Sequence, residues 1–404
     1  MNTIVQSQVQ THSIAAHWQA AIEMGYAVAL WKLPRQTDKQ LIVNLEDRQP
    51  TFKISLEDMP MGFAISPFLN PEGNDTIFIE AHLYFRFSAV GEPLQQAHQY
   101  SAIHPDRMTF ERIVADYIPR PKSDIHLPAA TADESEKNNY QNAVRQAVAA
   151  IESGQMQKVV LSRRKIIALQ SDFEVITAFE KLCEAYPNAF VSAVYLPTLN
   201  QVWLGASPET LVSLDADGVF KTVSLAGTQS AIDSGGQPIP VRDAVWTHKE
   251  IEEQAFVSRY IIDCLKKIRV REFIEEGPKT VIAGNLMHLR TDYSIDSRAI
   301  NFPELGSVML ELLHPTSAVC GMPKAAAQAF ILANEHYERT FYSGFLGPVN
   351  VENASALFVN LRCMKIENQT ATLYAGAGIT EDSIAEKEWQ ETELKCQTLL
   401  RVLE

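Results

Sequence analysis

The sequence predicts an α+β protein, because segments with helical periodicity alternate along the chain with short runs that are typical of β-strands. Apolar residues recur every three or four positions in residues 140–151, whereas residues 76–87 are rich in aromatic and β-branched side chains. Hydrophobic residues make up 46% of the 404 residues, which can supply a large core. The chain is longer than a usual domain, but we expect one compact domain overall.

Composition and charge argue against several classes of protein. The 35 basic and 49 acidic residues give a net charge of −14, which disfavours a nucleic-acid or anionic-membrane surface but still allows a local basic pocket. The five cysteines are scattered and lack C-x-x-C spacing, so we expect neither a disulfide framework nor a zinc site. No secretion signal opens the chain and no apolar run is long enough to span a bilayer, so we expect a soluble, cytoplasmic protein.

Residues 1–120 are predicted to form the N-terminal part of the α+β fold. A helix is expected over residues 14–24, because its apolar residues share one face and Gly25 follows as a stop signal. Strands are expected over residues 26–31 and 76–87. This part contains no chemical constellation, and we interpret its two most conspicuous histidines as structural or exposed residues: His82 and His104.

Residues 121–138 resemble a linker, since they contain Pro121, Pro128 and a run of polar side chains. The segment could also cross the surface of a single domain, so it need not mark a boundary. We assign residues 139–404 to the catalytic region.

A helix over residues 140–151 is followed by Gly154 and then by the β-rich run Lys158–Arg163. A lysine that opens a buried strand is either an edge residue with its ammonium in water or a desolvated amine. The segment alone favours the edge residue.

Two further strands are expected to lead into turns that could bind a ligand. The strand that starts at Gln201 runs into Gly205, and Glu209 then lies where it can point into a cleft, or where it is simply the first-turn acid of a helix. Residues 223–228 predict a strand that ends in a glycine turn, suited to binding an anion through backbone N–H groups, although a plain tight turn would look the same.

Near the C-terminus, the apolar run 371–375 is expected to end at Gly376, where the backbone could approach a ligand closely. A helix should follow, with two glutamates and Lys395 on one face.

Two expected helices each carry a pair of glutamates three residues apart. One pair is Glu250 and Glu253, near the start of a helix that opens at His248, and the other is Glu388 and Glu391. Either pair alone is typical of a solvated helix face. Together they could hold one hard cation, and the absence of a cysteine or histidine cluster favours Mg²⁺ over zinc.

In this combination the motifs resemble those of the chorismate-utilising enzymes, in order and at family-like spacing over about residues 140–404. The first third of the chain matches only loosely. The resemblance implies an aminodeoxychorismate synthase-like α+β fold, with large β-sheets packed together, helices outside and the site in a cleft between sheet and helices. The segments that carry it are Lys158–Arg163, Gly205–Glu209, Leu225–Thr228, Lys249–Glu253, His314–Val319, Tyr342–Gly344, Arg362, Gly376–Ile379 and Glu388–Thr392.

Within this family, the resemblance points to the branch that uses water rather than ammonia. Anthranilate and aminodeoxychorismate synthases typically carry glutamine in place of Lys158, and the latter often carry lysine in place of Ala226. Salicylate synthases tend to have threonine and alanine where this chain has Ala318 and Val319. The resemblance therefore implies an isomerase that forms isochorismate and needs no glutaminase subunit. Salicylate synthase and a component I of the ammonia users are the alternatives, and the intact acids argue against a non-catalytic relative.

The resemblance also implies roles for individual residues. Lys158 would be the base that activates water for attack at C2 of chorismate, and Glu209 the acid that protonates the departing C4 hydroxyl. Glu253 and Glu391 would bind Mg²⁺ directly, and Glu250 and Glu388 directly or through water. The expected substrate-binding residues are Gly227, Thr228, His288, Ala318, Val319, Tyr342, Arg362, Gly376 and Lys395.

The partners follow from the same resemblance: a small-molecule substrate, no nucleic acid, no membrane, and a monomer or weak homodimer. Menaquinone and catecholate siderophore synthesis both begin with isochorismate, and the sequence does not choose between them.

Overall fold

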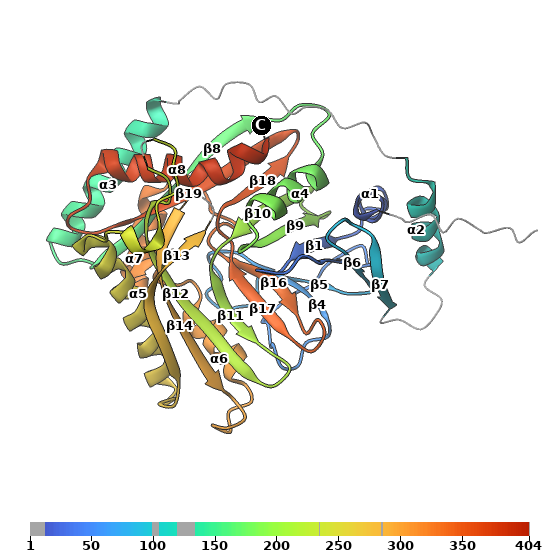
Figure 1. Cartoon of the computed structure of the whole chain (residues 1–404), viewed down its shortest axis with the longest axis horizontal. Coiled ribbons are helices and arrows are strands. Elements are labelled where there is room, and N and C mark those ends of the chain that lie inside the picture. Colours follow the sequence, from blue (N-terminus) through green and yellow to red (C-terminus); the bar gives the residue numbers. More distant parts are fainter. Residues whose placement is uncertain (1–12, 99–104, 119–133, 234, 284–285, 404) are drawn as a thin grey trace, which may run out of the picture.

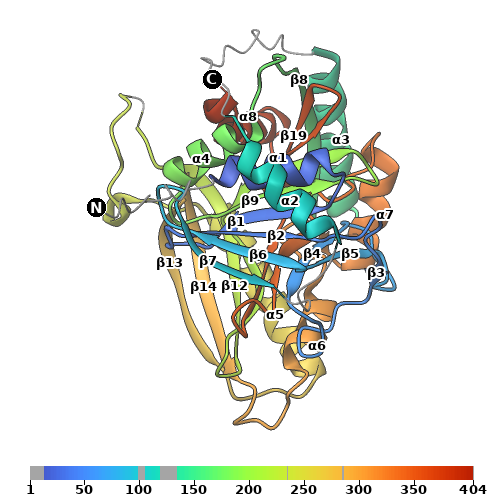
Figure 2. The same cartoon turned by 90° about the vertical axis from the view of Figure 1, so that its right-hand side faces the viewer.

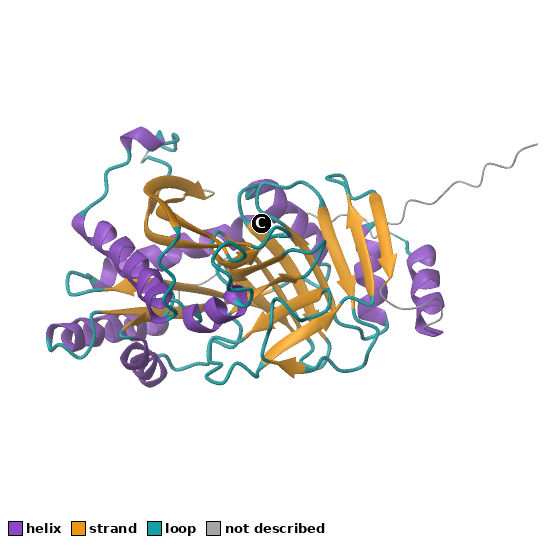
Figure 3. Ribbon diagram, turned by 90° about the horizontal axis from the view of Figure 1, so that it is seen from below, coloured by secondary structure: helices purple, strands orange, loops and turns teal. Residues whose placement is uncertain are grey.

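The computed structural model describes residues 13–98, 105–118, 134–233, 235–283 and 286–403. Two large antiparallel β-sheets pack face to face, and helices cover their outer faces (Figure 1). Figure 3 shows the strands gathered in the middle of the molecule and helices at its periphery. The predicted α+β architecture of packed sheets with outer helices is confirmed. His104 and residues 121–133 of the linker-like segment lie outside the described residues.

The first sheet has ten described strands. Their order is β15 (Gly321–Met322), β8 (Lys158–Ala168), β19 (Thr370–Ile379), β18 (Cys363–Glu367), β10 (Gln201–Ser207), β9 (Phe190–Leu196), β1 (Val28–Lys32), β2 (Lys39–Val43), β6 (Leu83–Phe87) and β7 (Pro93–His98).

The second sheet has nine described strands. Their order is β13 (Ile274–Ala283), β14 (Leu286–Asp296), β12 (Val219–Ser230), β11 (Thr210–Leu214), β17 (Ser355–Val359), β16 (Phe345–Val349), β4 (Gly62–Ser66), β5 (Thr76–Glu80) and β3 (Thr51–Phe52).

The described α-helices flank these sheets, and Figure 2 shows α1 and α2 lying over the N-terminal strands. No helix of the described chain is both long and apolar enough to cross a bilayer. The helices are α1 (Ile14–Glu23), α2 (Pro105–Asp116), α3 (Glu134–Glu152), α4 (Val175–Ala185), α5 (His248–Lys267), α6 (Leu305–Leu313), α7 (Lys324–Asn334) and α8 (Ala385–Leu403).

Successive side chains of a strand point to opposite faces of its sheet, so each sheet contributes to apolar clusters on both of its faces. In β1, Leu30 belongs to the apolar cluster beneath α1 and α4, whereas Trp31 belongs to the cluster between the sheets. Phe190 of the first sheet stacks on Phe358 of the second, with ring centroids 4.0 Å apart. On the far side of the second sheet, α5 and α6 contribute to a third cluster, which includes Val257.

The predicted helices over residues 14–24 and 140–151 and from His248 are confirmed as α1, α3 and α5. The single strand predicted over residues 76–87 is wrong, because β5 and β6 belong to different sheets. The amide of Ala81 donates to Met61 beside the second sheet, and the amide of His82 donates to Val43 of the first. The chain therefore changes sheets here while staying buried, so the apolar run hides the break.

The predicted end of the last strand at Gly376 is also wrong, since β19 continues to Ile379 and pairs with β8 throughout. Glycines are needed in β19 because neighbouring side chains leave no room for a Cβ atom. A Cβ on Gly376 would lie 2.9 Å from the Tyr342 hydroxyl oxygen, and one on Gly378 would lie 3.1 Å from Lys158 Cε. Close approach of side chains therefore explains the Gly-Ala-Gly sequence.

The predicted turn at residues 223–228 is instead part of β12, which runs on to Ser230. A register shift against β14 between Ala226 and Gln229 marks a bulge, and Gly227 has a positive φ of 68° there. A bulge bends the strand and exposes its backbone locally, so Gly227 still has a special backbone position.

Candidate active site

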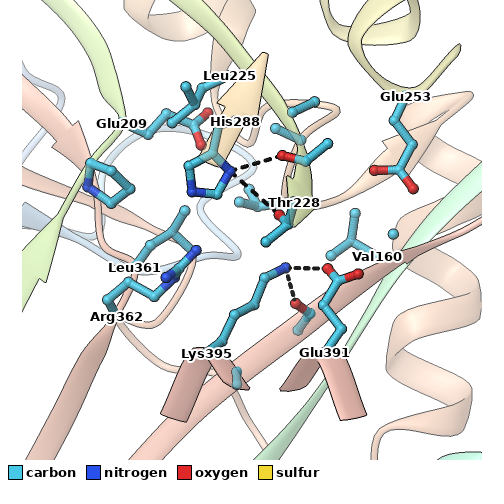
Figure 4. Close-up of a pocket in the computed structure, with 18 of the residues that line it drawn as sticks. Val160, Glu209, Leu225, Thr228, Glu253, His288, Leu361, Arg362, Glu391 and Lys395 are labelled. Carbon is cyan, nitrogen blue, oxygen red and sulfur yellow. Dashed lines mark hydrogen bonds and ion pairs between the residues drawn. The ribbon is translucent and has the colours of Figure 1, made fainter. Parts of the chain in front are cut away.

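One pocket brings together side chains from both sheets and from α5 and α8 (Figure 4). Glu250 and Glu388 are the two predicted site residues that do not line it. Those that do are Lys158, Glu209, Gly227, Thr228, Glu253, His288, Ala318, Val319, Tyr342, Arg362, Gly376, Glu391 and Lys395.

Lys158 enters the pocket from the start of β8 and is only 2% exposed. The interpretation of this lysine as an edge residue with its head in water is therefore wrong. Burial lowers the pKa of Lys158, and the neighbouring Glu253 carboxylate opposes that shift. The short strand β15 lies beside the first residues of β8 and helps to keep this end of the strand from water.

Glu209 lies at the point where the chain passes from β10 in the first sheet to β11 in the second. A strand follows it, so the alternative of a helix first-turn acid is excluded. The crossing is fixed by Ser207, whose hydroxyl donates to the Val359 carbonyl (2.6 Å), and by Val359, whose amide donates to the Glu209 carbonyl (3.0 Å). Burial raises the pKa of Glu209 to about 8, against the opposing charges of Lys158, Arg362 and Lys395.

These two groups form a matched acid–base pair. Burial favours the neutral form of each, which is an amine for Lys158 and a carboxylic acid for Glu209. A neutral amine can take a proton and a neutral carboxylic acid can give one, so a buried pocket with both can protonate one position of a ligand while deprotonating another.

His288 of β14 is a neutral, oriented imidazole. Its Nδ1 lies 2.8 Å from the Gly227 carbonyl oxygen, so Nδ1 carries the proton and donates there. Burial lowers the pKa of His288 to about 3, and the Arg362 charge adds to the shift. The buried Nε2 has no hydrogen-bond partner among the described residues, which leaves it as an acceptor.

Arg362 is a buried guanidinium without an acidic partner. Its backbone is left-handed (φ 48°), and no carboxylate of the described chain lies within salt-bridge distance of its side chain. Burial lowers the pKa of Arg362, although the Glu391 charge opposes this. An isolated buried cation is costly, and a guanidinium fork matches a carboxylate, so this corner of the pocket is suited to the carboxylate of a ligand.

Lys395 closes the same side of the pocket. Its ammonium donates to the Gly376 carbonyl (2.8 Å) and to the Glu391 carboxylate (2.6 Å), so α8 is tied to β19 at the pocket wall. Burial favours the neutral form of Glu391, but Lys395 and the other nearby cations outweigh it and lower the pKa of that carboxyl. The carboxylate is therefore charged.

The two pocket acids fit a hard cation. In Figure 4, Glu253 and Glu391 lie on the opposite side of the view from Glu209 and Arg362. Burial raises the pKa of Glu253, and the negative charge of Glu391 raises it further. A cation between them would relieve this repulsion.

No group of three or more acidic, histidine or cysteine side chains converges as a metal site in the described residues. Mg²⁺ usually takes one or two carboxylates and completes its shell with water and substrate oxygens. The donor set therefore fits Mg²⁺ and does not fit zinc.

The other acid of each pair is engaged elsewhere. Glu250 accepts hydrogen bonds from the backbone and hydroxyl of Thr247, and so caps its own helix. Glu388 is buried and accepts from Lys249 of α5 at 2.6 Å.

Several residues at the site were missed in the sequence. The strand alternation that places Lys158 in the pocket also places Val160 there, and Tyr374 precedes Gly376 by the same step. Strand alternation could therefore have identified both residues from the sequence.

The buried pair Glu335–Arg339 gave no signal, since it lies in the turn-rich segment after α7. Arg339 donates to the carbonyls of Val160 (2.7 Å) and Val319 (2.8 Å), and so joins two walls of the pocket.

Comparisons with known proteins place the chain among its relatives. A family model described as chorismate binding enzyme matches residues 81–404. Isochorismate synthase EntC of Escherichia coli (strain K12) is 30% identical over 273 residues, which cover 66% of this chain and 67% of that protein. Isochorismate synthase DhbC of Bacillus subtilis (strain 168) is 27% identical over 274 residues, 66% of this chain and 68% of that protein. The solved structure of MenF, the menaquinone-specific isochorismate synthase from Escherichia coli, has the same fold, with a TM-score of 0.75 at 21% identity over 96% of this chain and 91% of that one.

Proposed function

The chain belongs to the family of chorismate-binding enzymes, and we propose that it is an isochorismate synthase. It is then an isomerase (a hydroxymutase), in which water adds a hydroxyl at C2 of chorismate and the C4 hydroxyl departs. The names of the curated relatives EntC and DhbC support this reaction.

The observation that carries the proposal is the buried pair of Lys158 and Glu209. The reaction needs a base for the attacking water and an acid for the leaving hydroxyl. Lys158, with its pKa lowered by burial, takes the proton from water, and Glu209, with a pKa of about 8, gives one to the departing hydroxyl. One water adds at C2 and one leaves from C4, so the net change is an isomerisation, and the proton that Lys158 takes must pass back to Glu209 before the next turnover.

Chorismate has two carboxylates, and the cations of the pocket are suited to them. Arg362, which has no acidic partner among the described residues, would hold the enolpyruvyl carboxylate together with Tyr342 and the backbone N–H of Gly376. Gly227 and Thr228 would contact the ring carboxylate. Lys395 adds positive charge to the pocket. His288 lines the pocket, and we assign it no chemical step.

We propose Mg²⁺ as the cofactor, held directly by Glu253 and Glu391, whereas Glu250, which caps its own helix, and Glu388, which binds Lys249, would not bind the ion. When bound, the ion neutralises the ring carboxylate of chorismate and so favours substrate binding. The two facing carboxylates support this assignment.

Because water is the nucleophile, the enzyme needs no ammonia and hence no glutaminase subunit. Separately, we expect a cytoplasmic monomer or weak homodimer that binds neither nucleic acid nor membrane. Relatives named isochorismate synthase, one of them vibriobactin-specific, support isochorismate as the product, and the pathway that uses it stays open.

Product analysis tests the proposal. Purified protein with chorismate and Mg²⁺, and without any ammonia source, should give isochorismate by chromatography, and isochorismate added alone should return chorismate. The matched control is Glu209→Gln, which keeps the shape of the side chain but cannot act as an acid. Formation of anthranilate only when ammonia is added would overturn the assignment.

The identities of Ala318 and Val319 predict that little salicylate is made. These apolar side chains line the pocket and offer no hydroxyl to orient bound isochorismate for loss of pyruvate. Ala318→Thr should therefore raise the salicylate fraction. Salicylate and pyruvate as the main wild-type products, without added lyase, would place the chain in the salicylate-forming branch.

A further inference from the structure

A second cavity, of about 780 Å³, lies among α6, α7, the residues that follow β3 and the segment between β4 and β5. Figure 2 shows α6, α7 and β3 on the same side of the molecule. None of the described residues that line it also lines the catalytic pocket. Its volume lies in the range of about 300–1,000 Å³ typical of small-molecule sites.

The wall of this cavity is largely apolar. Leu69 and Leu332 are 39% and 60% exposed, so the rim presents two large aliphatic side chains to solvent. Exposed apolar groups around a concave surface are typical of a binding site. The apolar lining residues are Ile54, Leu69, Pro71, Val308, Leu310, Pro315, Leu332 and Phe345.

One cation of the lining lacks an acidic partner. Lys53 pairs with Glu311 at 2.8 Å, and Glu72 is exposed at the rim. Lys324, which is half-buried at the start of α7, donates to the His314 backbone carbonyl, and no carboxylate of the described chain lies within salt-bridge distance of it. Burial lowers the pKa of Lys324, which is the cost of an ammonium that lacks a counter-charge.

We propose that this cavity is a second ligand site, which takes an organic anion with an apolar body and holds its acidic group at the Lys324 ammonium. The apolar wall accounts for the body of the ligand, and the ammonium without an acidic partner accounts for its charge. The site is separate from the catalytic pocket, so it does not depend on the proposed reaction.

A pair of matched fluorescent probes tests this assignment. 8-Anilino-1-naphthalenesulfonate has an aromatic body and a sulfonate, and N-phenyl-1-naphthylamine has the same body without the charge. The folded wild-type protein should bind the sulfonate at one saturable site. The neutral probe should bind about tenfold more weakly, since a hydrogen bond to a charged group is worth roughly that factor.

Three variants locate the site. Lys324→Met should weaken the sulfonate about tenfold and leave the neutral probe within about twofold. Val308→Trp fills the cavity and should abolish saturable binding of both probes, which keeps the test valid if Lys324→Met does not fold. Lys266→Met, the matched control at a lysine of α5 outside the cavity that pairs with Asp263 (3.2 Å), should bind both probes like the wild type.

Three results would overturn the proposal. One is the absence of saturable sulfonate binding to protein that unfolds cooperatively. The second is binding that survives Val308→Trp. The third is binding that Arg362→Met abolishes and Lys324→Met does not, because the probe would then occupy the catalytic pocket.

Discussion

Helices α5 and α8 carry the same pair of glutamates three residues apart, and the structure uses the two members of each pair differently. In both helices the second acid, Glu253 or Glu391, lines the catalytic pocket. The first acid does not: Glu250 caps its own helix, and Glu388 is buried against Lys249 of α5. Spacing places both acids on one face, and the position of each within its helix decides what it contacts.

The first acids lie in the first turn of their helices, and they differ because different groups lie beside each turn. The second glutamate of each pair lies one turn further along its helix, where it lines the pocket. Glu250 is in the first turn of α5, so the free backbone N–H groups there claim its carboxylate. Glu388 is also in the first turn of α8 but faces α5, and its ion pair with Lys249 joins the two helices behind the pocket.

The largest loss of activity is expected when Glu253 or Glu391, the second acid of each pair, is replaced. Glu253→Gln and Glu391→Gln should each lower kcat/KM by about 10³-fold or more, because several kcal/mol of charge stabilisation by the metal would be lost. The measurement is the rate of chorismate consumption against Mg²⁺ concentration, after EDTA has abolished wild-type activity. Full wild-type turnover in metal-free buffer would remove the metal from the mechanism.

The effects of replacing Lys158 and Glu209, which lie at strand ends, are to be compared with those of replacing the helix acids. Lys158→Ala and Glu209→Gln should each lower kcat by about 10²–10⁴-fold, as expected for a positioned base or acid, with no change in the Mg²⁺ requirement. Glu209 must be protonated to act, and its pKa is about 8, so wild-type activity should fall as the pH rises through 8. That decline should be absent from the residual activity of Glu209→Gln. Rates within a few-fold of wild type in either variant would show that its role is misassigned.

An intermediate effect is expected for Glu388, whose ion pair links the helices. Lys249→Met leaves the buried Glu388 carboxylate without its cation, and Glu388→Gln leaves Lys249 with only the longer pair to Glu253 (3.7 Å), so each should cost about 1.5–3 kcal/mol of unfolding free energy. Activity should fall about tenfold, since the pocket acids lose support from behind. Urea unfolding of both single variants and the double variant gives the coupling energy, and additive losses would show that the pair does not connect α5 to α8.

Sequence reasoning found the elements with strong local signals. The spacing of apolar residues identified α1, α3 and α5, the spacing of charged residues identified α8, and the motifs identified thirteen residues that line the pocket, from Lys158 to Lys395. The glutamate spacing predicted a shared helix face. It could not show that the backbone of α5 would claim Glu250.

The misses have one physical cause, which is that each depends on a contact between segments far apart in the sequence. Ala81 and His82 sit in one run rich in aromatic and β-branched residues, yet their amides donate to different sheets. Gly376 looked like the end of a strand, but it is a place where the Tyr342 hydroxyl comes too close for a side chain. The ion pair of Glu335 with Arg339 depends on carbonyls from distant segments, so no local pattern could indicate it.

The smallest effect is expected for Glu250, the acid that caps its own helix. Glu250→Gln keeps an oxygen that can accept from the Thr247 amide, so stability and kcat/KM should stay close to those of the wild type. Glu250→Ala removes the acceptor and should cost about 1 kcal/mol of unfolding free energy, with activity per folded molecule within about threefold. Urea unfolding and initial rates measure the two quantities separately. If Glu250→Gln instead loses activity as severely as Glu253→Gln while the helix stays capped, the Glu250 carboxylate must leave Thr247 to reach the metal or its bound water. The two acids of α5 would then act as a pair, as their spacing first indicated.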